Sequence, residues 1–203
     1  IRDSPNPAAA NQGREDEVDE IQDGIDTIVS PYISRLEQFR LLEKNIPFGA
    51  KAGTRNSRYR VADPYFHFWL KFVDPLESRT LAEANRWGVL IEKTLGALPT
   101  YLGRSLESWY REDCLSSGEW SEAGAWWDKR GENEIDLVAL SIDRKTILFG
   151  EAKLNPEKFN AVKLAMKVEH FLALHPEFRG AAIRQCGLFP EGMGTTLSQL
   201  SPV

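Results

Sequence analysis

The sequence predicts a mixed α/β (α+β) chain, in which a small helix-and-hairpin unit precedes a larger domain with the element order αβββαβ. Two observations predict this. Apolar residues recur at helical spacing before residue 41, and two strand-like runs, residues 41–46 and 58–61, follow with a loop between them. Three strand-like runs come in quick succession after Glu119, and a helix and one more strand complete the order. A chain of 203 residues has room for two such units.

The beginning of the chain differs from the rest in composition. Residues 1–16 mix Pro, Ala, Asn and Gln with acidic residues and hold few large apolar groups, so we expect a disordered start. From residue 17 on, apolar residues recur at spacings typical of short helices. Ser30 and Pro31 then predict a helix start, because a capping hydroxyl precedes a proline at the first helical position.

Short helices, a longer helix and a two-stranded flap together predict a winged helix over residues 17–62. Its exposed positions are rich in positive charge, which suits contact with DNA phosphates. The predicted nucleic-acid-binding residues are Arg35, Arg40, Lys44, Lys51, Arg55, Arg58 and Arg60. Only Glu37 and Glu43 oppose them. Helix-turn-helix shapes also dock proteins, which is the alternative interpretation.

Residues 63–97 predict a helical connector, with an aromatic-rich helix over 65–73 and a further helix over 77–93. The larger domain then covers residues 98–203. We expect its first helix to start at Pro99 and to reach about residue 113, with Glu107 beside its apolar face. The predicted strands are 123–127, 134–140 and 146–154, followed by a helix over 156–174 and a strand over 180–188.

The spacing of the acidic residues in the middle two strands indicates a metal-binding site. If Asp143 and Arg144 form the tip of the hairpin, Asp136 lies directly opposite Glu151, and Lys153 projects from the same face as Glu151. Carboxylates opposed in this way lie about 5 Å apart. At an effective dielectric constant of about 20 they repel by about 3 kcal/mol. A divalent cation bound by both removes this repulsion, and oxygen ligands favour Mg²⁺ or Mn²⁺.

An ammonium group such as that of Lys153 beside a metal helps to position water or to stabilise charge on an attacked phosphate. Asp136, Glu151 and Lys153 on one face therefore predict a site for phosphodiester hydrolysis. The alternative is a structural hairpin with a solvated Glu–Lys pair, which is common on protein surfaces.

The phrases Ile135-Asp136-Leu137 and Gly150-Glu151-Ala152-Lys153 resemble the motif of the PD-(D/E)XK nuclease superfamily, whose restriction-endonuclease-like core is αβββαβ. The resemblance implies that Asp136 and Glu151 bind metal and that Lys153 acts with it. It also implies an auxiliary acidic residue. Glu107 on the preceding helix matches that position, and Glu134 is a second candidate.

Residues 32–36, 47–49 and 59–64, together with the aromatic run ending at Phe72-Val73, resemble the C-terminal region of archaeal-type ATPases of bacteria and archaea. This resemblance covers about residues 17–188. It implies that the chain is the portion following a nucleotide-binding module. No Gly-x-x-x-x-Gly-Lys-Ser/Thr loop is present, so we expect no ATPase activity from this chain itself.

Two functional hypotheses follow. The first is a Mg²⁺- or Mn²⁺-dependent deoxyribonuclease with a DNA-binding winged helix. The second is a catalytically inactive module that binds DNA or protein and regulates such an ATPase.

Composition excludes several other classes of protein. The net charge of −5 argues against a protein that coats nucleic acid over its whole surface. No run of about 18 apolar residues and no secretory pattern is present, so we expect a cytoplasmic protein. Cys114 and Cys186 are far apart in sequence and lie outside any Cys-x-x-Cys pair, so neither a disulfide framework nor a zinc site is predicted.

Overall fold

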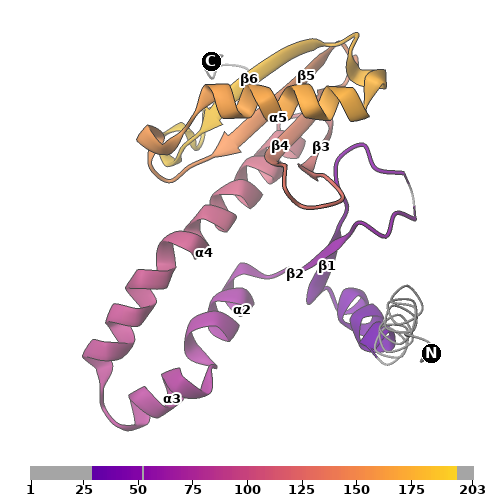
Figure 1. Cartoon of the computed structure of the whole chain (residues 1–203). Helices are drawn as coiled ribbons and strands as arrows, with labels where there is room; N and C mark the ends of the chain where they lie inside the picture. Colours follow the sequence, from indigo (N-terminus) through magenta and orange to yellow (C-terminus); the bar gives the residue numbers. More distant parts are fainter. Residues whose placement is uncertain (1–28, 52, 196–203) are drawn as a thin grey trace, which may run out of the picture. The chain divides into compact units, whose positions relative to one another are not determined.

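A computed structural model describes residues 29–51 and 53–195, and the predictions for residues 1–16 and for short helices before residue 29 lie outside this range. The chain divides into two compact units. The first unit comprises the residues up to Lys44 together with Tyr59–Asp63, and the second comprises Asn45–Arg58 and the residues from Pro64 onward. Figure 1 shows the order of the elements along the chain.

In the first unit, a helix is followed by one strand of a two-stranded sheet. Residues 29–38 are helical, and Arg40 has a positive φ of 56° where the chain leaves the helix. Strand β1 (Leu42–Asn45) then pairs with β2 (Arg58–Val61). The predicted helix and hairpin are therefore present. The predicted helix start at Ser30 is wrong, because residues 29 and 30 are already helical.

The loop between β1 and β2 belongs to the second unit, whereas the sequence placed it in a winged helix ending at residue 62. Phe48 is only 6% exposed and lies in the larger apolar core, where its amide donates to the Ala125 carbonyl at 2.8 Å. The Trp127 indole N–H donates to Asn56 Oδ1 at 2.9 Å. One buried aromatic residue and these two hydrogen bonds fasten the loop to the second unit.

The second unit continues with helices, whose boundaries differ from the predicted ones. They are α2 (Pro64–Phe68), the π-helix η1 (Trp69–Val73), α3 (Leu76–Glu83) and α4 (Trp87–Ser116). The predicted continuous helix over 77–93 is wrong. Asn85, with a positive φ of 56°, ends α3, because asparagine tolerates the left-handed conformation that terminates helices.

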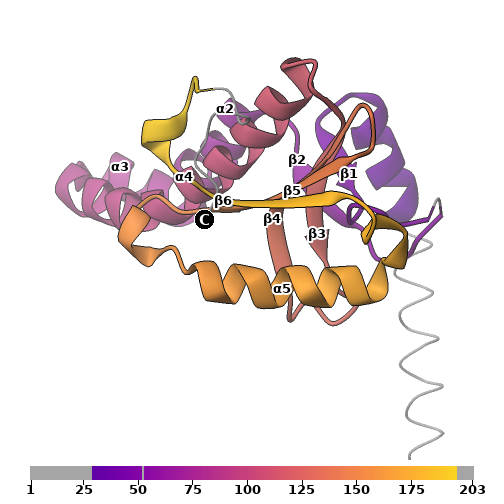
Figure 2. The same cartoon turned by 90° about the horizontal axis from the view of Figure 1, so that it is seen from above.

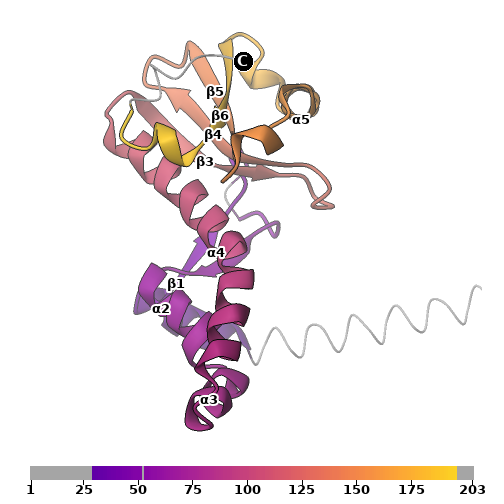
Figure 3. The same cartoon turned by 90° about the vertical axis from the view of Figure 1, so that its left-hand side faces the viewer.

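The predicted helix start at Pro99 is also wrong, since Pro99 lies inside the 30-residue helix α4. A proline in a helix removes one hydrogen bond and crowds the carbonyl four residues earlier. That residue is Leu95, which is 60% exposed, so the crowding falls on the open side of the helix. The helix rises about 1.5 Å per residue and is therefore about 45 Å long (Figure 3).

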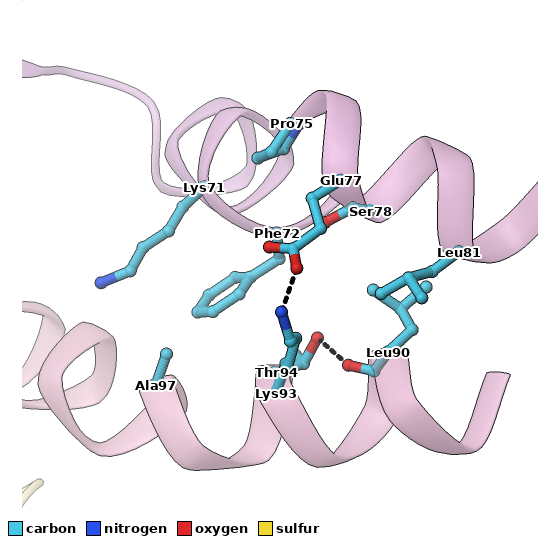
Figure 4. A pocket seen from close by; sticks show the side chains of 10 residues that line it. All are labelled: Lys71, Phe72, Pro75, Glu77, Ser78, Leu81, Leu90, Lys93, Thr94 and Ala97. Carbon is cyan, nitrogen blue, oxygen red and sulfur yellow. Dashed lines mark hydrogen bonds and ion pairs between the residues drawn. The ribbon is translucent and has the colours of Figure 1, made fainter. Parts of the chain in front are cut away.

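A small cavity of about 160 Å³ lies where α3 packs on the first half of α4 (Figure 4). The ion pair between Glu77 and Lys93 joins the two helices beside it, and Phe72 and Leu81 supply part of its apolar lining. The Thr94 hydroxyl donates to the Leu90 carbonyl at 2.9 Å and is thus satisfied within α4. The cavity is a packing gap in the helical hairpin, and none of the predicted site residues lines it.

The rest of the second unit is a four-stranded mixed sheet with the order β3-β4-β5-β6. β4 is antiparallel to both β3 and β5, and β6 is parallel to β5. The strands and the long helix are β3 (Trp120–Trp127), β4 (Glu134–Ser141), β5 (Thr146–Ala152), α5 (Ala161–Leu174) and β6 (Ala182–Leu188). Single 3₁₀ turns are η2 (Pro156–Lys158), η3 (Pro176–Phe178) and η4 (Pro190–Gly192). From α4 onward the predicted order αβββαβ is confirmed.

Helices cover both faces of this sheet (Figure 2). On one face, Leu164, Val168 and Phe171 of α5 pack against a cluster that includes Phe149 of β5. On the other face, the second half of α4 packs against a cluster that includes Leu148. Because both faces are buried, β4 and β5 are nearly continuous apolar runs, and a polar side chain within them is conspicuous.

The register of the β4–β5 hairpin agrees with the prediction. The recorded pairs run from Leu140 opposite Ile147 to Leu137 opposite Gly150. The chain turns over residues 142–145, and Arg144 there has a positive φ of 57°. The turn is longer than the predicted two residues, but its centre is the same, so the pairing is unchanged.

Gly150 provides a test of this packing. A Cβ atom at this position would lie 2.6 Å from Leu188 Cδ1 and 3.0 Å from its Cγ, and Leu188 is fully buried. We predict that Gly150→Ala lowers the free energy of unfolding by about 1–3 kcal/mol, as overpacking does. Urea denaturation measures this.

The matched control is Gly96→Ala in the exposed middle of α4, where an added Cβ meets no atom within 4 Å. It should raise the free energy of unfolding by about 0.5–1 kcal/mol, because alanine is the better helix former. Equal effects of the two substitutions would contradict the close approach of β5 and β6.

Candidate active site

Asp136 lies at an irregularity in β4. Between Val138 and Ile135 this strand has one residue more than β3 has between the paired Gly124 and Trp126, which is a β-bulge. Ile135 and Val138 therefore both belong to the cluster under α5, although regular alternation would turn them to opposite faces. Bulges of this kind change the direction of a side chain.

The side chain of Asp136 reaches the neighbouring strand beyond the last recorded β4–β5 pair. Its Oδ2 accepts a hydrogen bond from the Ala152 amide at 2.8 Å. The predicted position of Asp136 directly opposite Glu151 lies one step beyond the last recorded pair, Leu137 and Gly150, and continues the same register. The carboxylate of Asp136 lies where β4 and β5 separate and where β5 pairs with β6 alone.

Glu151 is a charged side chain in the buried part of β5, with 9% of its surface exposed. Lys153 Nζ lies 2.8 Å from Oε1, and Lys167 Nζ lies 2.9 Å from Oε2. Burial by itself would raise the pKa of Glu151, but the hydrogen bonds from the two lysines outweigh it and lower that pKa. The carboxylate is therefore ionised at neutral pH and holds one ammonium group on each oxygen.

Helix α4 brings Glu107 and Arg111 to the same region. The Arg111 guanidinium donates to the Asp136 carbonyl at 2.9 Å and lies 3.9 Å from Glu107 Oε2. Its side chain is only 15% exposed, so this contact helps to hold the bulge against the helix. The last turns of α4 thus reach the strand segment that carries Asp136.

Burial and, after it, the nearby carboxylate of Asp136 raise the pKa of Glu107 to about 7, while Arg111 opposes the change. Burial also raises the pKa of Asp136, against the Ala152 amide and the charge of Lys153, which lower it. Glu151 and Lys167 act on Asp136 as well, so all these groups share one electrostatic neighbourhood. Crowded, partly desolvated carboxylates are typical of functional sites.

The structure brings together all four predicted catalytic residues, and their charges nearly balance. The acidic members are Glu107, Asp136 and Glu151, and the basic members are Arg111, Lys153 and Lys167. Glu134, the second candidate for the auxiliary position, acts electrostatically on Glu107 but forms an ion pair with Arg58 at 2.9 Å. Both candidates therefore lie near Asp136.

Sequence analysis missed Arg111 and Lys167. Arg111 lies four residues after Glu107, one helical turn along, which was a usable signal. Lys167 carries no such signal, since lysines on the outer face of a helix are usually solvated. Its position three residues after Leu164 and one before Val168 places it beside the buried stripe of α5, but which strand residue it meets depends on the packing of that helix.

The donor atoms suit a hard divalent cation. Mg²⁺ is commonly held by one or two carboxylates together with water and substrate phosphate. Asp136 and Glu151 would supply two such carboxylates, and the carboxylate of Asp136 is, after burial, the second cause that raises the pKa of Glu107. Within residues 29–51 and 53–195, no three His, Cys, Asp or Glu side chains are arranged to hold a metal ion together.

The seven predicted DNA-contacting residues are divided between the two units. Arg35, Arg40, Lys44 and Arg60 belong to the first, and Lys51, Arg55 and Arg58 to the second. Three of them are engaged in contacts. Lys44 Nζ lies over the Tyr59 ring at 5.9 Å, and Arg60 forms an ion pair with Glu43. Arg58 lies over the Trp127 ring at 4.4 Å besides its ion pair with Glu134. Lys51 and Arg55 are exposed.

Comparison with known proteins finds a similarity for part of this region. A family described as archaeal and bacterial proteins of unknown function (DUF234) matches residues 69–164. The match includes Glu107, Asp136, Glu151 and Lys153 and ends within α5, before Lys167.

An uncharacterized protein of Methanocaldococcus jannaschii is 28% identical over 143 residues, which cover 66% of this chain and 31% of that protein. The matched region is thus about a third of that relative's length. No solved structure matches the chain. In the part of the chain that the structure describes, no helix has the length and apolar character needed to cross a membrane.

The raised pKa of Glu107 predicts a pH dependence of stability. A carboxyl group whose pKa is higher in the folded protein than its usual 4.5 binds its proton more tightly when folded. Its contribution to stability is therefore present below pH 4.5 and is lost as the pH rises through about 7. The shift corresponds to about 3 kcal/mol.

Glu107→Gln stays neutral at every pH. In EDTA at pH 8 we expect it to unfold with a free energy up to about 3 kcal/mol higher than the wild type, and at pH 5 the difference should largely vanish. Urea denaturation at the two pH values measures this. The control is Glu112→Gln at an exposed position of the same helix, which should remain within about 0.5 kcal/mol of the wild type. A pH-independent effect of Glu107→Gln would contradict the buried carboxyl group.

Proposed function

We propose that this chain is a DNA-binding, metal-dependent nuclease module that hydrolyses phosphodiester bonds. The observation that carries the proposal is the meeting of Asp136, Glu151 and Lys153 where β4 and β5 separate, with Lys153 Nζ 2.8 Å from Glu151 Oε1. The element order from α4 to β6 and the mixed sheet support a restriction-endonuclease-like fold for this domain. Hydrolysis would add water across one P–O bond and leave a phosphate monoester and a hydroxyl group.

In this proposal Asp136 and Glu151 hold Mg²⁺ or Mn²⁺. The bound ion supplies Lewis acidity toward a phosphate oxygen and lowers the pKa of a bound water. The Ala152 amide orients Asp136 through its hydrogen bond to Oδ2. Lys153, the first residue after β5, offers an ammonium group to the negative charge that develops on the phosphate.

Glu107 is proposed as the auxiliary acidic residue. With a pKa of about 7, its carboxyl group exchanges a proton near neutral pH, which suits a group that accepts a proton from water and returns it. Arg111, bound to the Asp136 carbonyl, keeps this end of α4 beside the site.

We propose that DNA is held by the basic residues of the helix over 29–38, of the β1–β2 sheet and of the loop that connects the two strands. The helix followed by a two-stranded sheet supports a winged helix as the binding element. The matched relative is about three times longer than the region shared with this chain, which supports a larger protein context. We propose that a nucleotide-binding ATPase module belongs to that context.

The first test is cleavage. Wild-type protein with Mg²⁺ or Mn²⁺ is expected to cut DNA, and Asp136→Ala or Glu151→Gln should reduce the rate by about 100-fold or more, as loss of a central electrostatic group does. Glu169→Gln, an exposed acid on α5, is the control and should retain the rate of the wild type. Purified wild-type protein that cuts neither single-stranded, duplex nor branched DNA with either ion would end the nuclease proposal.

A second function is favoured by one observation. Lys153 and Lys167 satisfy both oxygens of Glu151 within the protein itself, so the site is electrically balanced as it stands. The same arrangement therefore suits a catalytically inactive scaffold that binds DNA or a partner protein and regulates an ATPase.

DNA contact by the loop is tested separately. Replacing the exposed Lys51 and Arg55 with alanine should weaken duplex binding and reduce the slope of log K against log salt by about 2, since each lost phosphate contact contributes about 0.9. Fluorescence anisotropy between 50 and 200 mM salt, about the range over which counterion release acts, measures the slope. The exposed pair Lys145→Ala and Lys163→Ala is the control and should leave it unchanged. An affinity without salt dependence would contradict phosphate contacts.

A further inference from the structure

Lys167 differs from the other lysines of α5 in its surroundings. Its Nζ lies 2.9 Å from Glu151 Oε2, and its side chain is only 26% exposed. Lys163, one helical turn earlier, is exposed. A long, flexible side chain is thus held against a carboxylate that is itself almost fully buried.

The packing of α5 fixes this contact. Leu164 and Phe171 are fully buried and Val168 is 2% exposed, so the helix is anchored on the sheet through positions on both sides of Lys167. The ammonium group is presented to the end of β5 by that anchoring. A buried carboxylate without a partner is strongly destabilising, and a second cation on its free oxygen removes this penalty.

We propose that Lys167 is a positioning residue that acts as an internal counter-cation, holding Oε2 of Glu151 until a divalent cation replaces its ammonium group there. The inference rests on the proposed function, because it gives Glu151 a metal to bind. Lys153 keeps its place on Oε1, and Lys167 is the cation that yields. Lys167 thereby weakens the apparent metal affinity and keeps the metal-free site ordered.

Mn²⁺ binding tests the competition. Isothermal titration of the whole chain with Mn²⁺ should show Lys167→Met and Lys167→Gln binding the ion about tenfold or more tightly than the wild type, because a positive charge beside the carboxylate has been removed. Lys167→Arg keeps the charge and should stay within about threefold of the wild type, less than the tenfold that 1.4 kcal/mol represents. Lys163→Met is the matched control and should change nothing.

A merely structural role of Lys167 gives the opposite result. If its side chain only packed α5 on the sheet, the uncharged variants would bind Mn²⁺ equally well or more weakly, and either outcome overturns the proposal.

A double-mutant cycle in EDTA examines the contact without metal. Lys167→Met should raise the unfolding equilibrium constant about tenfold in the wild type, and by less than about threefold when Glu151→Gln has removed the charge that Lys167 balances. Equal effects in the two backgrounds would overturn the pairing. If the wild type binds no Mn²⁺ while the cycle shows coupling, the proposed metal function fails and the positioning of Glu151 by Lys167 stands.

Discussion

A carboxylate buried in a sheet must be matched by positive charge, and the matching of Glu151 organises the larger unit of this protein. Lys153 reaches Oε1 from the position just after β5, and Lys167 reaches Oε2 from α5. The second contact exists only because the buried side chains of α5 seat the helix on the sheet. The charge balance of the site therefore depends on the packing of the core, since a shift of α5 would leave one oxygen of Glu151 without its partner.

The bulge at Asp136 serves the same region from the other face of the sheet. It turns a carboxylate toward the Ala152 amide where β4 and β5 part, and Arg111 of α4 fastens the backbone of Asp136. β5 and β6 approach closely at Gly150 and remain paired beyond the point where β4 separates from β5. Two helices from opposite faces thus each contribute a cation to a single group of acids.

The charges of the site are compatible both with catalysis and with a scaffold that has no activity. Burial, and after it the neighbouring Asp136 carboxylate, raise the pKa of Glu107 to about 7, which favours a role in binding a cation or transferring a proton. Its lysines are close enough to neutralise Glu151 unaided, which allows the fold to persist as a scaffold. The similarity to archaeal and bacterial proteins of unknown function spans most of these residues, and the relative from Methanocaldococcus jannaschii extends well beyond the shared region. The reaction at the site and the partner of the chain are thus separate questions.

The sequence by itself determined the order of elements from α4 to β6, the register of the β4–β5 hairpin, and the proximity of Asp136, Glu151 and Lys153, because strand periodicity and a short turn fix local geometry. Only the tertiary structure decided what depends on contacts distant in sequence. Phe48 draws the β1–β2 loop into the larger core, the bulge redirects Asp136, and α5 delivers Lys167 to Glu151. The helix boundaries were also decided by the tertiary structure. The left-handed conformation of Asn85 ends α3, and α4 continues through Pro99, where the crowded residue Leu95 is exposed.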